Sequence, residues 1–125
     1  RSDIIFAFHT DGHVEPIVPD FVEIGLDVLN PVQPGCMDDR RLKREFGDRL
    51  TFWGGMNVQS TIPFGTPEDV VAEVRDRLQT FGEDGGFVIS SAHNVQPNTR
   101  SVDNTLAYYW ACRRYGEYRD GSPAA

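Results

Sequence analysis

The sequence predicts an α/β protein made of four βα units, and three observations lead to this prediction. Four short apolar runs recur along the chain, and each is followed by a segment with the apolar spacing of a helix. The chain has 125 residues, whereas a closed TIM (β/α)8 barrel takes about 250 residues. We therefore expect one domain, residues 1–125, that forms half of such a barrel. The sheet would be completed by self-association or by an N-terminal half outside this sequence.

The predicted strands are rich in β-branched and aromatic residues and do not alternate strictly between apolar and polar. They cover residues 4–8, 26–29, 50–53 and 86–90. This pattern is typical of parallel strands that are covered on both faces. An open, flavodoxin-like sheet remains an alternative, because it needs no second half to close it.

Four helices are predicted between and after these strands. The first carries an apolar face over residues 14–22 and stops at Gly25, and the second runs from residue 38 or 39 to Gly47. The third spans residues 66–81, with Thr66 as its N-cap. The last begins near residue 101, and we expect its Trp110 to lie in the core or in an interface. The tail, residues 119–125, is expected to fray.

Composition excludes several classes of function. The net charge of −7, from 12 basic and 19 acidic residues, argues against a general nucleic-acid binder. No apolar run approaches the roughly 20 residues that span a membrane, and no secretory signal opens the chain. Two cysteines, Cys36 and Cys112, are too few for a disulfide framework. We expect a cytoplasmic protein that binds a small molecule.

Polar or glycine-rich sequence follows each predicted strand, where ligands meet parallel α/β folds. His9, Asn30, Gln33 and Asn94 can form hydrogen bonds to a substrate there, and His93 precedes Asn94. The pair Gly54 and Gly55 permits close approach to a ligand, or takes an unusual φ angle for structural reasons.

Asp11 and His93 are the candidate catalytic residues. His9 and Asp11 are two residues apart at a strand end, so in extended geometry they share a face and can act as an acid/base pair. The alternative for Asp11 is a helix cap, and the alternative for His93 is a hydrogen bond to a backbone carbonyl. His9, Asp11 and His93 together are also a candidate site for zinc or another divalent metal. We expect His13 to be a surface residue.

Several segments of this chain resemble one protein family in combination. The segments are FHTDGHVEPIVPDFVEIGLDVLNPVQP, FGDRLTFWGGMNVQ, FGTPEDVVAEVRDRL and GGFVISSAHNVQPNT. They are similar to the C-terminal half of the uroporphyrinogen decarboxylase superfamily, and the similarity covers about residues 3–112. The resemblance implies a (β/α)8 barrel of which this chain supplies strands five to eight.

The resemblance implies two chemistries, one for each branch of the family. The decarboxylase branch, a group of lyases, protonates an acidic tetrapyrrole as carboxylates leave, and His93 matches a histidine of its last-strand loop. The methyltransferase branch binds zinc through a His-x-Cys motif and uses a corrinoid as co-substrate. His9 matches that histidine, but Asp11 stands where the cysteine would be. The arginine and aspartate central to decarboxylation belong to the family's N-terminal half.

Two functions follow from these observations. The first is decarboxylation or methyl transfer, in the complete form of the protein, on a tetrapyrrole-related or corrinoid-linked substrate. The second is a non-catalytic half-barrel that forms a homodimer and so closes an eight-stranded barrel with twofold symmetry.

Overall fold

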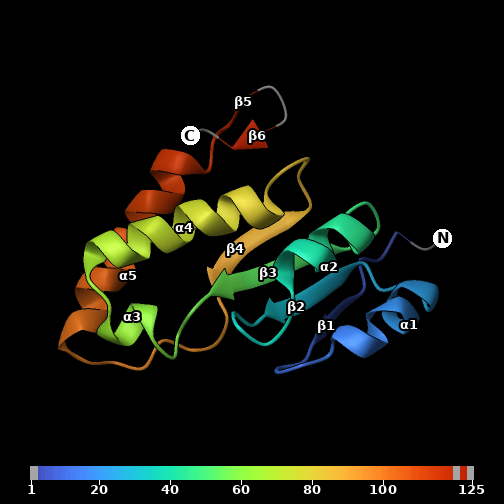
Figure 1. The fold of residues 1–125 in the computed structure, drawn as a ribbon, viewed down its shortest axis with the longest axis horizontal. Helices are drawn as coiled ribbons and strands as arrows, with labels where there is room; N and C mark the ends of the chain where they lie inside the picture. Colours follow the sequence, from blue (N-terminus) through green and yellow to red (C-terminus); the bar gives the residue numbers. More distant parts are fainter. Residues whose placement is uncertain (1–2, 120–121, 124–125) are drawn as a thin grey trace.

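The core of the protein is a four-stranded parallel sheet whose strands follow the order of the chain (Figure 1). The structure is a computed structural model and describes residues 3–119 and 122–123. The strands are β1 (Ala7–His9), β2 (Val28–Val32), β3 (Thr51–Met56) and β4 (Phe87–Ser91). A flavodoxin-like sheet reverses its strand order at a switch point, and this sheet does not. The four βα units in one open sheet are consistent with part of a TIM barrel.

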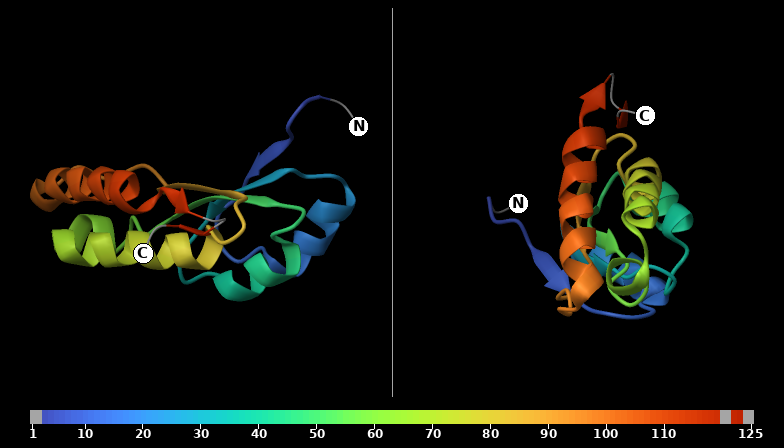
Figure 2. Two further views of the ribbon diagram at one scale, coloured as in Figure 1. Left: turned by 90° about the horizontal axis from the view of Figure 1, so that it is seen from above. Right: turned by 90° about the vertical axis from the view of Figure 1, so that its left-hand side faces the viewer.

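The four predicted helices are all present, with two additions. The 3-10 helix η1 (Glu15–Ile17) and α1 (Val18–Glu23) follow β1, and α2 (Asp39–Phe46) follows β2. A short helix that was not predicted, α3 (Thr61–Phe64), precedes α4 (Pro67–Phe81), and α5 (Thr99–Tyr115) follows β4. Thr66 caps α4 as predicted, and Asp38 caps α2. Helices α1, α2 and α4 lie on one side of the sheet, and α5 packs beside α4 (Figure 2).

The two faces of the sheet are buried to different extents. Leu29 and Phe52 are cross-strand partners and are fully buried under the helices. Trp53 and Val88, a pair one position further along, are 41% and 48% exposed. Successive side chains alternate between faces, so Trp53 points away from the helices. Our prediction that both faces are covered is therefore wrong, because the helices packed on the described strands lie on one side.

The first strand is shorter and later than predicted. We expected residues 4–8, but β1 covers only Ala7–His9, and Ile4 and Ile5 are largely exposed. β1 is an outer strand, and its partner β2 begins at Val28. Residues 4 and 5 therefore have no neighbouring strand to pair with, whatever their β propensity.

Two apolar clusters make up the core on the helix side. One joins α1 and α2 to β2 and β3, and the other joins α3, α4 and α5 to β3 and β4. Phe87, at the start of β4, packs against both clusters. The two clusters thus hold β2, β3 and β4 against the helices, whereas the residues of β1 are exposed.

Helix α5 buries polar residues and exposes apolar ones. Asn104 is buried and donates hydrogen bonds from Nδ2 to the carbonyl oxygens of Ile62 (2.9 Å) and Gly65 (2.8 Å). Leu106 and Trp110 are 64% and 56% exposed. Trp110 is therefore not a core residue, and our alternative of an interface stays a prediction. The inner face of α5 is polar at Asn104 because this residue satisfies the last carbonyl groups of α3, whereas Tyr108 and Ala111 further along the helix belong to the second apolar cluster.

The tail is more regular than predicted where the structure describes it. β5 (Tyr118–Arg119) and β6 (Ser122–Pro123) form an antiparallel pair, so fraying is wrong for these residues. The two pieces bond to each other, which a frayed end does not do. The predicted fraying of residues 120–121 and 124–125 lies outside the described residues.

No helix in the described part of the chain has both the length and the apolar character needed to cross a membrane.

Candidate functional site

Two adjoining cavities lie at the carboxyl ends of the strands. The first has a volume of about 330 Å³ and is lined by polar side chains that include Asp11, Gln33, Asn57, His93 and Asn94. The second, of about 400 Å³, lies on the open face of the sheet and is lined by His9, Asn30, Trp53, Ser90, Ser91, Ala92, His93 and Asn94. The predicted site residues other than the two glycines thus lie at one edge of the sheet, because parallel strands bring their carboxyl ends together.

A chain of polar contacts runs across this edge from Asp11 to Trp53. Asn30 donates from Nδ2 to the carbonyl oxygen of Trp53 at 3.0 Å, so its Oδ1 faces the ring of His9, 2.6 Å from Nδ1. His9 Nδ1 must therefore carry a proton. His9 Nε2 lies 3.4 Å from Asp11 Oδ2. The ring of His9 is held between an amide oxygen and a carboxylate, and Nε2 can donate to Asp11 when the ring is protonated.

Asp11 is not a helix cap. The helices that follow it, η1 and α1, have Val14 and Ile17 at their N-cap positions, without a side-chain capping bond. Gly12 has φ 81° and turns the chain directly after Asp11, and its N–H donates to Gln33 Oε1 at 3.1 Å. The Asp11 side chain is consequently left at the cavity and next to His9.

His93 and Asn94 are exposed at the end of β4, and both line the two cavities. Neither side chain forms a hydrogen bond or ion pair with another of the described residues. The alternative in which His93 bonds a backbone carbonyl is therefore not observed within residues 3–119 and 122–123. His13 does make such a bond, to the carbonyl of Cys36 at 2.8 Å, and is an exposed residue as expected.

The predicted metal ligands do not form a metal site. In the described part of the chain, no group of three His, Cys, Asp or Glu side chains is arranged to hold a metal ion. His9 and Asp11 follow β1 and His93 follows β4, the two outer strands, with β2 and β3 between them. At about 4.8 Å per strand, β1 and β4 are about 14 Å apart. The His9, Asp11 and His93 set is thus a poor fit to zinc, and Cys112, whose pKa burial raises to about 11, supplies no thiolate nearby.

Gly54 and Gly55 serve packing within the sheet and do not line the cavities. Both are buried in β3, with φ values of 130° and 91°. A Cβ on Gly54 would lie 3.0 Å from the backbone nitrogen of Val32, and one on Gly55 would lie 3.2 Å from Phe87 Cζ. Of our two interpretations of these glycines, the structural one fits, since the neighbouring strand occupies the space that a ligand would need.

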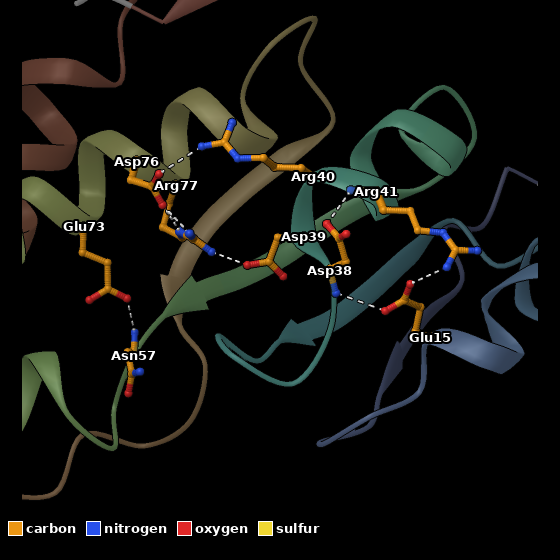
Figure 3. Close-up of polar contacts among 9 residues, drawn as sticks. All are labelled: Glu15, Asp38, Asp39, Arg40, Arg41, Asn57, Glu73, Asp76 and Arg77. Atoms are coloured by element: carbon orange, nitrogen blue, oxygen red, sulfur yellow. Dashed lines mark hydrogen bonds and ion pairs between the residues drawn. The ribbon is translucent and has the colours of Figure 1, made fainter.

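Asn57 is a cavity residue that our sequence analysis missed. Its Oδ1 accepts hydrogen bonds from the backbone N–H groups of Gln59 (2.8 Å) and Ser60 (2.9 Å). Its own N–H donates to Glu73 Oε1 of α4 at 2.8 Å (Figure 3). The side chain is thereby fixed at the end of β3. An asparagine that precedes a serine and a helix is a local signal for such a turn.

Ion pairs and hydrogen bonds connect the helices on the other side of the sheet from the open face. Arg77 of α4 bonds to Asp76 and reaches across to Asp39, the first residue of α2 (Figure 3). Burial raises the pKa of Asp39, and the charge of Arg77 offsets this only in part. Glu15 accepts a hydrogen bond from the N–H of Asp38 at 3.0 Å. The Arg77–Asp39 and Glu15–Asp38 contacts join residues far apart in sequence and hold the start of α2 against α4 and against the segment after β1.

Comparison with known proteins agrees with the resemblance in the sequence. The family described as Uroporphyrinogen decarboxylase (URO-D) matches residues 1–115. No curated protein sequence matches the chain. The family match extends over all four strands and both cavities, and on this basis the chain belongs to the uroporphyrinogen decarboxylase (URO-D) family.

Proposed function

We propose that this chain supplies the carboxyl-edge part of an active site that decarboxylates a tetrapyrrole-related small molecule. Family membership supports the class of reaction. The observation that carries the proposal is the placement of the Asp11–His9 pair and the unpaired His93 around adjoining cavities at the ligand edge of the sheet.

The reaction needs a group that handles a proton. The bond between the substrate carbon and its carboxylate breaks, CO2 leaves, and a proton takes its place on the carbon. Asp11 and His93 are the two ionisable side chains that line the first cavity, so we assign proton transfer to them. His9 is a positioning residue, which orients Asp11 and is itself oriented by Asn30.

Decarboxylation is better supported than methyl transfer from a corrinoid. In the methyltransferase branch a zinc ion activates the thiol that accepts the methyl group. The described residues offer no three-ligand cluster, and Asp11 replaces the cysteine of the motif. We therefore propose no step that requires a metal in this part of the site.

The test is decarboxylase activity with uroporphyrinogen, measured as CO2 release and as loss of substrate carboxyl groups. Removing a general acid or base costs about 10²–10⁴ in rate, so Asp11→Asn and His93→Ala should each lower kcat/KM by that order. His13→Ala, outside the cavities that hold Asp11 and His93, is the matched histidine control and should retain activity. Unchanged activity in both site variants, or no turnover by the assembled wild type, would contradict the proposal.

We also propose that two copies of this chain complete the sheet. β1 and β4 are outer strands of a fully parallel sheet, so a twofold axis along the strands would pair β1 of one copy with β4 of the other. Exposed apolar residues lie at both edges. At the β1 edge they are Ile4, Ile5 and Phe6, and at the β4 edge they are Val88, Val102, Leu106, Tyr109 and Trp110. Their burial would stabilise the pairing of the edges.

Light scattering tests this assembly. A dimer has twice the chain mass of 14.1 kDa, and Trp110→Glu should convert it to a monomer by placing a charge in the exposed face of α5. A dimer that does not decarboxylate would favour our second function, a non-catalytic homodimeric half-barrel. A well-folded wild-type monomer would contradict the assembly and assign both edges to an N-terminal half from outside this sequence.

A further inference from the structure

We infer that the side-chain amides of Gln33 and Asn57 form a subsite that binds a carboxylate oxygen of the ligand. The inference rests on the proposed function for the nature of that ligand, a carboxylate-bearing small molecule. Neither the family match nor the acid/base roles of Asp11 and His93 assign this subsite.

The amide of Asn57 has only its donor end free. Its Oδ1 accepts from two backbone N–H groups, those of Gln59 and Ser60. A backbone N–H can only donate, so the oxygen must face these two groups and the NH2 group must face away from them. Asn57 is half-buried and lines the first cavity, and its Nδ2 bonds to no other described residue.

The amide of Gln33 is oriented by the same logic. Its Oε1 accepts from the N–H of Gly12 at 3.1 Å, which leaves its NH2 group without a partner among the described residues. Gln33 directly follows β2 and Asn57 directly follows β3, and these two strands are neighbours in the sheet. Two amide donors from adjacent strand ends therefore line one cavity of about 330 Å³.

Structural amides elsewhere in the protein use their donor ends. Asn98 accepts from two N–H groups at the start of α5, as Asn57 does before α3, but its Nδ2 also donates to the carbonyl of Pro63 at 3.1 Å. Asn30 donates to Trp53, and Asn104 donates to the carbonyls that end α3. The unused donors of Gln33 and Asn57 are therefore not a general property of the amides that shape this fold.

The free NH2 groups of the two amides favour a ligand group that accepts hydrogen bonds and does not donate them. A carboxylate has two acceptor oxygens and no donor, whereas an ammonium group has donors only. No lysine or arginine lines this cavity, so the interaction is between neutral donors and an anion. Asp11 lies in the same cavity and opposes an anion, but its Oδ2 faces His9. We expect a dissociation constant in the millimolar range for a single carboxylate.

The test is an NMR titration of the 125-residue chain, in which the side-chain NH2 signals are observed directly. Sodium propionate is the probe, and propylammonium chloride at equal ionic strength is the control. Propionate should shift the NH2 signals of Gln33 and Asn57 to saturation, and propylammonium should not. Asn57→Asp and Gln33→Glu assign these signals, because each variant loses one of them.

The same variants test the donor role. Asn57→Asp keeps an oxygen to accept from Gln59 and Ser60, so the turn is retained while the donor becomes an acceptor. We expect propionate binding, followed on the remaining NH2 signal, to weaken at least about tenfold in each variant. Gln79→Glu adds the same charge on α4, outside this cavity, and should leave the dissociation constant unchanged.

The inference is overturned if propionate gives no saturable shift, if propylammonium shifts the same signals equally, or if both variants bind propionate as tightly as the wild type. The titration needs no turnover, so it separates this inference from the proposed function. Decarboxylation without propionate binding would contradict only the proposed subsite. Propionate binding without decarboxylation would contradict only the proposed reaction.

Discussion

Phe52 and Trp53 are consecutive residues of β3 that lie on opposite faces of the sheet. Phe52 is fully buried beneath the helices and packs against Phe81 of α4, with ring centroids 5.1 Å apart. Trp53 is 41% exposed and lines the cavity on the open face. Both residues are large, aromatic and typical of strands, so the difference comes from what lies across each face and not from composition.

Polar groups differ between the two regions in the same way. On the helix side, Arg77 is paired with two aspartates, and Thr66 and Asp69 bond to each other. At the carboxyl edge, His93 and Asn94 are unpaired within the described residues, and two amides keep free donors. The ion pairs and the cap on the helix side thus serve the structure, whereas some of the polar groups at the carboxyl edge stay available where a ligand would bind.

The largest expected effect is the difference in unfolding free energy between the variants Phe52→Ala and Trp53→Ala. Loss of a buried phenylalanine costs about 3–5 kcal/mol of unfolding free energy, because a cavity remains in the core. Trp53→Ala should cost under about 1 kcal/mol, since its surroundings are partly solvent. Urea unfolding of both variants measures this. Equal costs would show that the open face is covered in solution, for example by a second copy.

A smaller difference in unfolding free energy is expected between two variants of α5, Asn104→Ala and Leu106→Ala. The first leaves the carbonyl groups of Ile62 and Gly65 without their buried donor, at a cost of about 1–3 kcal/mol. The second removes an exposed side chain and should change stability by under about 0.5 kcal/mol. Thermal unfolding at low protein concentration gives both values. A large loss for Leu106→Ala that grows with concentration would mean that a partner copy covers this face.

The elements that sequence predicts best are those with local signals. Helix α4 was predicted at its observed ends, because Thr66, Pro67 and Gly82 mark its boundaries within the chain itself. The covering of the sheet was not predictable, since an apolar run such as the one around Trp53 is the same whether or not a helix lies across it. The exposure of the apolar side of α5 was not predictable for the same reason, since the sequence does not show whether another element covers that side.

The site divides along the same line. His9 and Asp11 were predicted to interact because they are two residues apart on one strand end, and they do. The three predicted metal ligands do not come together, because His93 follows β4 whereas His9 and Asp11 follow β1 at the other edge of the sheet. The order of the strands in the sheet cannot be deduced from the spacing of these residues in the sequence. Asn57 was missed because the local turn that orients its amide is visible in the sequence, but the cavity that it lines exists only in the folded chain.

The smallest expected effect concerns Asp69, an exposed carboxylate that is nevertheless used for structure. The backbone N–H of Thr66 donates to Asp69 Oδ2 at 2.8 Å, and this bond lowers the pKa of Asp69. A pKa lowered by folding means that the charged form stabilises the folded state at a pH above the unfolded pKa. That contribution is lost as the pH falls through the folded pKa.

Asp69→Asn should therefore be less stable than the wild type near neutral pH, with a difference that shrinks as the pH falls below about 4. Urea unfolding at several pH values measures the difference, and Glu68→Gln, which removes the neighbouring acid of the same helical turn, is the matched control. The control should show a smaller change with pH, because no hydrogen bond of the described residues involves the Glu68 side chain. A constant difference between the wild type and Asp69→Asn at all pH values would mean that the cap recognises the shape of the side chain and not its charge. The charge of Asp69 would then not explain how this polar group on the helix side stabilises the fold.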